Sequence, residues 1–413
     1  MGLNEKYNRG HKQADPSAAA KGRAGVLPHI PDVERALVTL DETVFAQILH
    51  EYHHGREKGQ SCHNKYLDPY FKWMPGYTSV ITGWPGHGKS RLFFELLLLR
   101  AAFEGKKSAI WPSENLPAKT FYQDLLHTLT GRPADKSQHN HLSPAELKRA
   151  ADFLRDKIIL LSPPTGMGYT PAHMLAICEG AIAKYGGAKD EEGIAHCMLD
   201  PWNKQDHTAK AKLGGDEGYL VHSLGLCTKW SQDTGQCLVL TAHPKRLNEL
   251  DFGKTRPVPD GASISGGQTW ENMPHFVGAV HRPFKHIPGN TEAAFYSHKC
   301  KDELNVAKLG TVGGYGFDGT PPSVPVHWDS VSLRYRWGKE RWSPLDDEQV
   351  KVIYATPTAA PAPKLPLDPA PRPASPPPAP SQAMPASTFE AEGTASEYAP
   401  ETFGPRIIRL PGQ

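Results

Sequence analysis

The segment Gly83-Trp-Pro-Gly-His-Gly-Lys-Ser90 has the spacing G-x-x-x-x-G-K-[ST]. Glycines let such a loop curl so that its backbone N–H groups point at a phosphate, and a helix beginning at the last residue adds its N-terminal dipole. Lys89 would reach the β- and γ-phosphates of a nucleotide, and the Ser90 hydroxyl would bind Mg²⁺. The predicted nucleotide-binding residues are Gly83, Trp84, Pro85, Gly86, His87, Gly88, Lys89, Ser90 and Arg91.

Two carboxylates could complete this site. Asp200 follows the apolar segment 193–199, and ligands gather at the carboxyl ends of strands in open α/β sheets. We therefore predict that Asp200 shares the Mg²⁺ ion with Ser90, the alternative being a turn residue before Pro201. No glutamate follows Asp200, so Glu114, near the end of another apolar run, is the candidate to polarise an attacking water. A loop carboxylate without function is the alternative for Glu114.

Short apolar runs and helical periods alternate along the chain, which predicts an α/β fold with a mostly parallel central sheet. The sequence after 275 is rich in strands and predicts antiparallel strands that extend one edge. The predicted strands are 77–82, 108–111, 158–161, 194–199, 237–241, 276–281, 293–298 and 332–337. The predicted helices are 31–52, 90–103, 117–130, 143–156, 171–185 and 216–233.

Composition limits the class of protein. The chain has 413 residues with 46 basic and 44 acidic side chains, a net charge of +2, which excludes a wholly basic coat protein but permits a local basic channel. No apolar run reaches the roughly 20 residues that span a bilayer, and the polar N-terminus has no apolar signal core. We therefore expect no membrane association and a cytoplasmic location. The six cysteines form no C-x-x-C pair and predict free thiols.

The distribution of prolines indicates where the folded part of the chain ends. Twelve of them lie in the 29 residues 357–385, a composition that cannot bury enough apolar surface to fold. We predict a disordered arm at 1–30, a linker or docking helix region at 31–70, an ATPase domain at 71–345 and a disordered tail at 346–413. The predicted helix of the 31–70 region could pack on a neighbouring subunit or on its own domain.

The motifs together resemble the RecA-like motor domain of DnaB/Twinkle-type replicative helicases, in the phage and plasmid primase-helicase form without the primase part. The resemblance covers roughly 70–338. It rests on Met74-Pro-Gly-Tyr-Thr-Ser-Val-Ile-Thr-Gly83 before the phosphate loop, Pro112-Ser-Glu-Asn115, Leu199-Asp-Pro-Trp-Asn203, Thr241-Ala-His-Pro244, Ile264-Ser-Gly-Gly-Gln-Thr-Trp270 and Val280-His-Arg282.

This resemblance implies a RecA-like ATPase that uses ATP and Mg²⁺ at the subunit interfaces of a ring, usually a hexamer, and moves along single-stranded DNA. It implies that Glu114 is the catalytic carboxylate and that His243 senses the γ-phosphate, although His243 could equally be a strand-end histidine. Family members often carry a Lys and an Arg that reach the neighbouring subunit's nucleotide. Lys299 and Lys301 stand there in this chain, and Lys301 lacks the planar fork of arginine. Arg282 is another candidate for that role.

Loops after the sensor strand line the pore in RecA-like rings. The predicted DNA-binding residues are Lys245, Arg246, Lys254 and Arg256, with a solvated loop as the equal alternative. The loop 204–212 is a second candidate. The leading hypothesis is therefore an ATP-dependent DNA helicase or translocase of phage or mobile-element replication, in the host cytoplasm if phage-encoded, whose tail could bind a primase or loader. The alternative is a RecA-like regulatory ATPase or helicase loader that uses nucleotide as an assembly switch.

Overall fold

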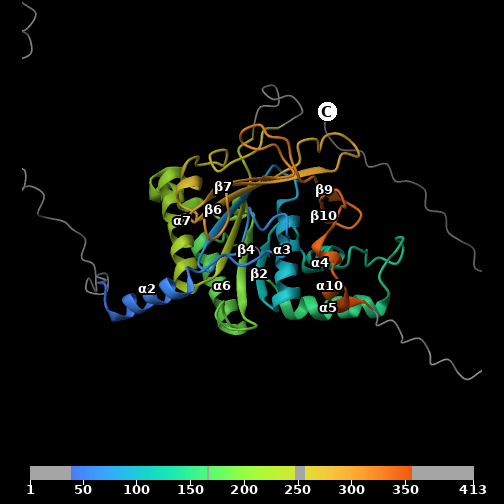
Figure 1. The fold of residues 1–413 in the computed structure, drawn as a ribbon, viewed down its shortest axis with the longest axis horizontal. Helices are drawn as coiled ribbons and strands as arrows, with labels where there is room; N and C mark the ends of the chain where they lie inside the picture. The colour runs from blue at the N-terminus through green and yellow to red at the C-terminus, as the bar shows by residue number, and fades with distance from the viewer. Residues whose placement is uncertain (1–38, 165–166, 247–255, 356–413) are drawn as a thin grey trace, which may run out of the picture. The chain divides into compact units, whose positions relative to one another are not determined.

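A ten-stranded sheet forms the centre of the molecule in the computed structural model, which describes residues 39–164, 167–246 and 256–355 (Figure 1). The strands are β1 (Thr78–Thr82), β2 (Lys107–Pro112), β3 (Ile158–Leu160), β4 (Ile194–Asp200), β5 (Cys237–Ala242), β6 (Phe276–His281), β7 (Glu292–Cys300), β8 (Gly310–Val312), β9 (Val326–Asp329) and β10 (Arg334–Trp337).

The sheet has a parallel half and an antiparallel half. Its order is β10-β9-β7-β6-β1-β5-β4-β2-β3, and β8 pairs with β7 beside β9. The six strands from β3 to β6 in this order pair in parallel, and β7 to β10 join by antiparallel pairing. The carboxyl ends of the parallel strands therefore meet at one edge, which we call the carboxyl edge, and their first residues form the amino edge.

Helices connect the strands and cover the sheet. The described helices are α2 (Glu42–His54), α3 (Lys89–Glu104), α4 (Ala118–Thr130), α5 (Pro144–Lys157), α6 (Pro171–Tyr185), α7 (Gly215–Thr234), α9 (Thr269–Asn272) and α10 (Glu348–Tyr354), with short 3₁₀ turns η2 (Trp202–Lys204), η3 (Thr208–Leu213) and η4 (Pro344–Asp346). Side-chain hydrogen bonds define where two of the helices begin. Ser143 and Thr170 are the N-caps of α5 and α6, each in a capping box and each followed by proline.

Two cores lie on opposite faces of the sheet, because successive side chains of a strand point to opposite sides. Ile81 and Val239 belong to the core with α3, α4, α5 and α10, whereas Val80, Leu238 and Leu240 belong to the core with α6 and α7. Figure 1 shows α6 and α7 on one side of the strands and α3, α4 and α10 on the other. Strands buried on both faces are nearly continuous apolar runs, which made them recognisable in the sequence.

The predicted fold class is confirmed: a mostly parallel sheet with antiparallel additions is flanked by helices. Four strands and helices were not predicted: the strands β8 and β9 and the helix α9 are short, and α10 adjoins the proline-rich segment. Helix α10 lies within the residues that we assigned to the tail, and its Val350 and Tyr354 are buried. The folded chain thus continues past the predicted boundary at 345, because these apolar residues pack against α3 and α5 rather than remaining in solvent.

The predicted helix at 31–52 differs from the observed helix α2 at both ends. Helix α2 begins at Glu42, where the Asp41 side chain accepts a hydrogen bond from Val44 N at 2.8 Å, and it ends at His54. Residues 1–38 and 356–413 lie outside the described residues, so the predicted arm and most of the predicted tail stay predictions. None of the described helices is long and apolar enough to cross a membrane.

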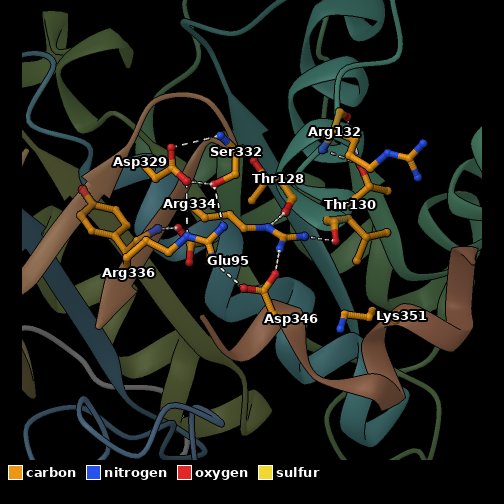
Figure 2. Close-up of polar contacts among 12 residues, drawn as sticks. Glu95, Thr128, Thr130, Arg132, Asp329, Ser332, Arg334, Arg336, Asp346 and Lys351 are labelled. Atoms are coloured by element: carbon orange, nitrogen blue, oxygen red, sulfur yellow. Dashed lines mark hydrogen bonds and ion pairs between the residues drawn. The ribbon is translucent and has the colours of Figure 1, made fainter. Parts of the chain in front are cut away.

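A buried ionic network fixes the antiparallel edge to the helices (Figure 2). Arg334 of β10 donates hydrogen bonds to the carbonyls of Thr128 (2.6 Å) and Leu129 (2.5 Å) near the end of α4 and pairs with Asp346 of η4 at 2.6 Å. On the other side of β10, Glu95 of α3 accepts a hydrogen bond from Tyr335 N at 2.7 Å. Strand β10 is thereby held against helix α3, which follows the phosphate loop.

Candidate active site

The phosphate loop connects β1 to α3 at the carboxyl edge of the sheet. Gly86 and Gly88 have positive φ angles of 72° and 90°, a conformation that residues with a Cβ rarely adopt. Helix α3 begins without a side-chain cap, because its N-cap residue is Gly88. The backbone N–H groups of its first turn are therefore available to an anion, as a phosphate-binding loop requires.

Tyr335 supports this loop from β10. Its hydroxyl lies within hydrogen-bond distance of the carbonyl oxygens of His87 (3.2 Å) and Gly88 (3.1 Å) and shares its one proton between them. A Cβ at Gly88 would lie 2.1 Å from that hydroxyl, so only glycine permits the approach. Burial raises the pKa of Tyr335 far above its ordinary value, which keeps the hydroxyl protonated and able to donate.

A pocket of about 640 Å³ lies beside the loop. It collects side chains from the carboxyl ends of several neighbouring elements, as expected for an open α/β sheet. Its lining residues are Pro85, Gly86, Gly88, Lys89, Ser90, Arg91, Glu114, Asn115, Asn203, Lys204, His243, Arg282 and Trp328.

Lys89 and His243 are in contact inside this pocket. The Lys89 Nζ lies 3.3 Å from Nδ1 and 3.4 Å from Nε2 of His243, and either nitrogen could accept its hydrogen bond. Burial lowers the pKa of Lys89, whereas Asp200 and Glu114 act in the opposite direction. Burial and then the charge of Lys89 lower the pKa of His243. His243 is therefore neutral near pH 7.

Asp200 is buried at the end of β4. One of its carboxylate oxygens accepts a hydrogen bond from the Thr241 hydroxyl, and its backbone oxygen accepts one from Ser113 N at 2.8 Å. The described residues contain no cluster of three or more His, Cys, Asp or Glu that could hold a metal alone. A hydroxyl from Ser90, a carboxylate from Asp200 and nucleotide phosphates are nevertheless the hard oxygen ligands that Mg²⁺ prefers, so the residues fit this ion.

Glu114 lies at the pocket mouth, just beyond β2. Its Oε1 is 3.9 Å from His243 Nε2 and 4.0 Å from Lys204 Nζ, and its side chain is 48% exposed. Asn203 Oδ1 accepts a hydrogen bond from His243 N at 2.9 Å, which holds the histidine backbone between the ends of β4 and β5. Glu114 thus lines the same pocket as the phosphate loop.

Two arginines of the pocket have unused donors. Arg91 pairs with Asp124 at 2.6 Å, but its Nη1 is buried without a hydrogen-bond partner among the described residues. The same holds for Nε of Arg282, whose guanidinium lies 5.9 Å from the centre of the Trp328 ring. Buried donors without partners are costly, and an anionic ligand would satisfy these two only if the side chains turned toward the pocket.

Three of the predicted nucleotide-binding residues, Gly83, Trp84 and His87, do not line the pocket. Trp84 is only 2% exposed, and its indole N–H donates to Pro257 O at 2.9 Å, so it shields the loop rather than covering the pocket. His87 Nδ1 accepts a hydrogen bond from Arg282 N at 2.9 Å. Burial lowers the pKa of His87 to about 3 and that of the neighbouring His281 to about 4.

The structure separates Lys299 and Lys301 from this pocket. Both lie at the end of β7, whose antiparallel pairing places Lys299 opposite Val277 at the amino edge. Lys299 Nζ donates to three backbone carbonyls, those of Glu271, Asn272 (3.1 Å) and Pro274 (2.7 Å). Lys301 is exposed. Within one chain these lysines cannot contact the nucleotide of their own phosphate loop.

The predicted DNA-binding residues are only partly described. Lys245 and Arg246 are exposed beyond the end of β5, and Arg256 lies with its guanidinium 5.0 Å from the centre of the Trp84 ring. Lys254 lies outside the described residues. In the second candidate loop, Lys210 pairs with Asp216 at 2.9 Å.

Sequence reasoning assigned no role to Asn115, Asn203, Trp328 and Tyr335. Asn115 and Asn203 end two of the motifs that carry the resemblance, each shortly after a predicted strand, and that position was a usable signal. Trp328 belongs to β9, which was not predicted, and the antiparallel pairing that brings it to the pocket leaves no motif in the sequence.

Comparisons with known proteins identify a related sequence and structures of similar fold. No protein-family model matches the chain. A relative in Arabidopsis thaliana, the chloroplastic/mitochondrial Twinkle homolog protein, is 26% identical over 233 residues, which cover 55% of this chain and 31% of that protein. The match therefore spans less than a third of the relative's length.

Solved structures agree at the level of the fold. An ATPase domain aligns with a TM-score of 0.53 and 12% identity, over 71% of this chain and 97% of that one. A DnaB-like replicative helicase, described with its primase interactions, aligns with a TM-score of 0.54 and 12% identity, over 73% of this chain and 69% of that one. The chain has the fold of a DnaB-like helicase ATPase domain, which confirms the resemblance found in the sequence.

Proposed function

We propose that this protein is an ATP-dependent helicase or translocase that moves along single-stranded DNA. The observation that carries the proposal is the pocket at the carboxyl edge, where Lys89, Glu114 and His243 converge on the phosphate loop of a DnaB-like ATPase fold. The similarity to a Twinkle homologue supports the same activity.

The chemistry follows from the placement of the side chains. The phosphate loop would bind the ATP phosphates through backbone N–H groups. Ser90 and Asp200 would hold Mg²⁺, which would supply positive charge to the phosphates. Lys89 balances negative charge at the γ-phosphate. Glu114 orients and polarises the attacking water, and His243 contacts Lys89 from the end of β5, where it can respond to the γ-phosphate.

Assembly into a ring, with a hexamer as the expected form, completes the proposal. Lys301, or Lys299 once it leaves the carbonyls that it binds, would reach the nucleotide of a neighbouring copy. Arg282 is less suited to act on a neighbouring copy, because it lines the pocket of its own chain. The strand of DNA would pass beside Lys245 and Arg246, which neutralise phosphates without reading bases.

Finer assignments rest on the sequence resemblance. We infer a role in phage or mobile-element DNA replication, a cytoplasmic location and a primase or loader as partner of the tail. The DnaB-like structural relative is described together with primase, which supports a partner of that kind.

The test is ATP hydrolysis with and without oligo-dT, together with unwinding of a forked duplex. We expect oligo-dT to stimulate hydrolysis, and Lys89→Ala to reduce the rate by at least about 100-fold, because transition-state charge loses its buried cation. Glu114→Gln should lower the rate by about 100-fold or more while ATP still binds.

Lys148→Ala is the matched control, since Lys148 is exposed and pairs with Asp152 within α5; its rate should equal that of the wild type. ATP binding without stimulation by DNA and without unwinding would instead identify a regulatory ATPase or loader.

A further inference from the structure

A strap, residues 256–264, runs between the phosphate loop and the exposed basic residues after β5. Near its start, Pro257 O accepts the hydrogen bond from the Trp84 indole at 2.9 Å. Midway, Pro259 O lies 3.0 Å from His298 Nε2 of β7. Near its end, Ser263 O accepts a hydrogen bond from Lys245 N at 2.8 Å, and Ile264 bridges Pro244. The strap therefore contacts both the nucleotide-binding loop and the backbone of Lys245.

The first of these contacts is well defined because Trp84 is buried. The ring is 2% exposed, its N–H is used by Pro257 O, and the Arg256 guanidinium lies 5.0 Å from its centre. Trp84 follows directly after Gly83, so any movement of the phosphate loop moves this ring. An indole held by a hydrogen bond and a cation–π contact transmits such a movement to the strap rather than sliding past it.

The strap is stiff enough to transmit a displacement. Pro257 and Pro259 fix two of its backbone φ angles. A tight turn follows, in which Ser263 N donates to Asp260 Oδ1 at 2.8 Å and Ser263 Oγ donates to Asp260 O at 2.6 Å. This turn ends at the carbonyl that binds Lys245.

We propose that the strap is a second mechanical connection between the nucleotide site and the DNA-contacting residues Lys245 and Arg246, with Trp84 as the positioning residue at its nucleotide end. The inference rests on the proposed function. This connection is separate from the contact of Lys89 with His243. The strap contacts Trp84 at the start of the phosphate loop, whereas Lys89 lies at the end of that loop, and the strap reaches Lys245 through other backbone groups.

The connection has a thermodynamic consequence. If nucleotide changes the affinity for DNA through the strap, DNA changes the affinity for nucleotide by the same factor. The quantity to measure is the coupling ratio, the Kd for oligo-dT without nucleotide divided by the Kd with a non-hydrolysable ATP analogue, by fluorescence anisotropy.

The test uses Trp84→Phe in the full chain, which keeps an aromatic ring beside Arg256 but removes the N–H donor together with part of the ring. We expect the coupling ratio to fall about fivefold, which corresponds to about 1 kcal/mol at 1.4 kcal/mol per factor of ten. His298→Phe removes the middle anchor and should lower the ratio as well. Trp230→Phe is the matched control, because its indole also donates one hydrogen bond, to Glu179 at 3.1 Å, but lies in α7 away from the strap.

The outcomes separate the two proposals. A wild-type protein that neither binds oligo-dT nor hydrolyses ATP faster with it contradicts the proposed function. A wild-type coupling ratio retained in both Trp84→Phe and His298→Phe overturns the role of the strap while leaving the proposed function intact. An equal loss in Trp230→Phe, with melting temperatures lowered alike in all variants, also overturns it, because the effect would then be general destabilisation.

Discussion

Three histidines near the phosphate loop, His87, His243 and His281, have pKa values that burial lowers. All three are therefore neutral near pH 7 and add no positive charge beside the phosphate loop. Burying an imidazole without charging it also makes folding sensitive to acid, because protons bind the unfolded chain more readily.

His281 gives the sign and size of this effect. Its pKa of about 4 in the folded protein lies below the unfolded value of about 6.5, so its stabilising contribution is fully present above pH 6.5 and is lost as the pH falls toward 4. At pH 5 we expect the wild type to have lost about 2 kcal/mol of unfolding free energy through this group.

Urea unfolding at pH 7.5 and pH 5 measures that loss. In His281→Phe the difference between the two pH values should shrink by about 2 kcal/mol, since a phenyl ring does not titrate. If His281→Phe kept the full wild-type difference in unfolding free energy between the two pH values, the pKa of His281 would not be lowered in the folded protein.

At the scale of elements, β10 and η4 complete the core that packs against α3 and α4. Arg334 is 1% exposed and donates to carbonyls near the carboxyl end of α4, where a helix favours cations. Arg336 contacts Asp329 at 3.3 Å and also pairs with Asp346. Tyr335, between these arginines, reaches the phosphate loop, so the network that holds β10 also positions the site.

Arg334→Met should therefore cost about 3–5 kcal/mol of unfolding free energy, because it leaves buried carbonyls and part of Asp346 without their partner. Chemical denaturation followed by circular dichroism measures this loss. Arg155→Met is the control: Arg155 is 75% exposed beside Asp152, and its loss should stay within about 0.5 kcal/mol. Equal small losses in both variants would contradict a structural role for Arg334.

The elements that sequence could predict share a physical reason. Parallel strands β1, β2, β4 and β5 are buried on both faces, so their apolar runs are continuous, and motif residues at their carboxyl ends converge without further information. Lys89, Glu114 and His243 came together for that reason. The contacts of Tyr335 and Trp328 depend instead on antiparallel register and on short strands, which no local pattern encodes. The orientation of Trp84 is likewise set by the strap, 173 residues away in sequence.

On the scale of the whole molecule, α2 carries an apolar face that its own chain leaves exposed. Phe45 is 49% exposed, Ile48 51% and Leu49 43%, and no residue of the helix is buried. These residues are three and four apart, so they share one side of the helix. If copies assemble into the proposed ring, we predict that a second copy covers this face, rather than the domain to which α2 belongs.

Ile48→Asp should therefore lower the mass of the assembly formed with ATP analogue and oligo-dT, measured by analytical ultracentrifugation. A charge in a buried contact is unfavourable, and each ring repeats it at every interface. Val352→Asp, on the exposed side of α10, is the control and should leave the mass unchanged. An unchanged mass in Ile48→Asp would show that α2 does not hold the copies together.

The reversal of strand direction between β6 and β7 has a consequence for counting active sites. It places the phosphate loop and Lys301 at opposite edges of one sheet. If Lys301 acts on the nucleotide of a neighbouring copy, as we propose, each copy presents its phosphate loop to one neighbour and its Lys301 to the other. Copies joined in this way associate head to tail. An open row of copies then always has one phosphate loop that no neighbouring Lys301 reaches, whereas a closed ring has none. Ring closure would therefore activate a final site without adding a single subunit, and hydrolysis per chain would rise at that step.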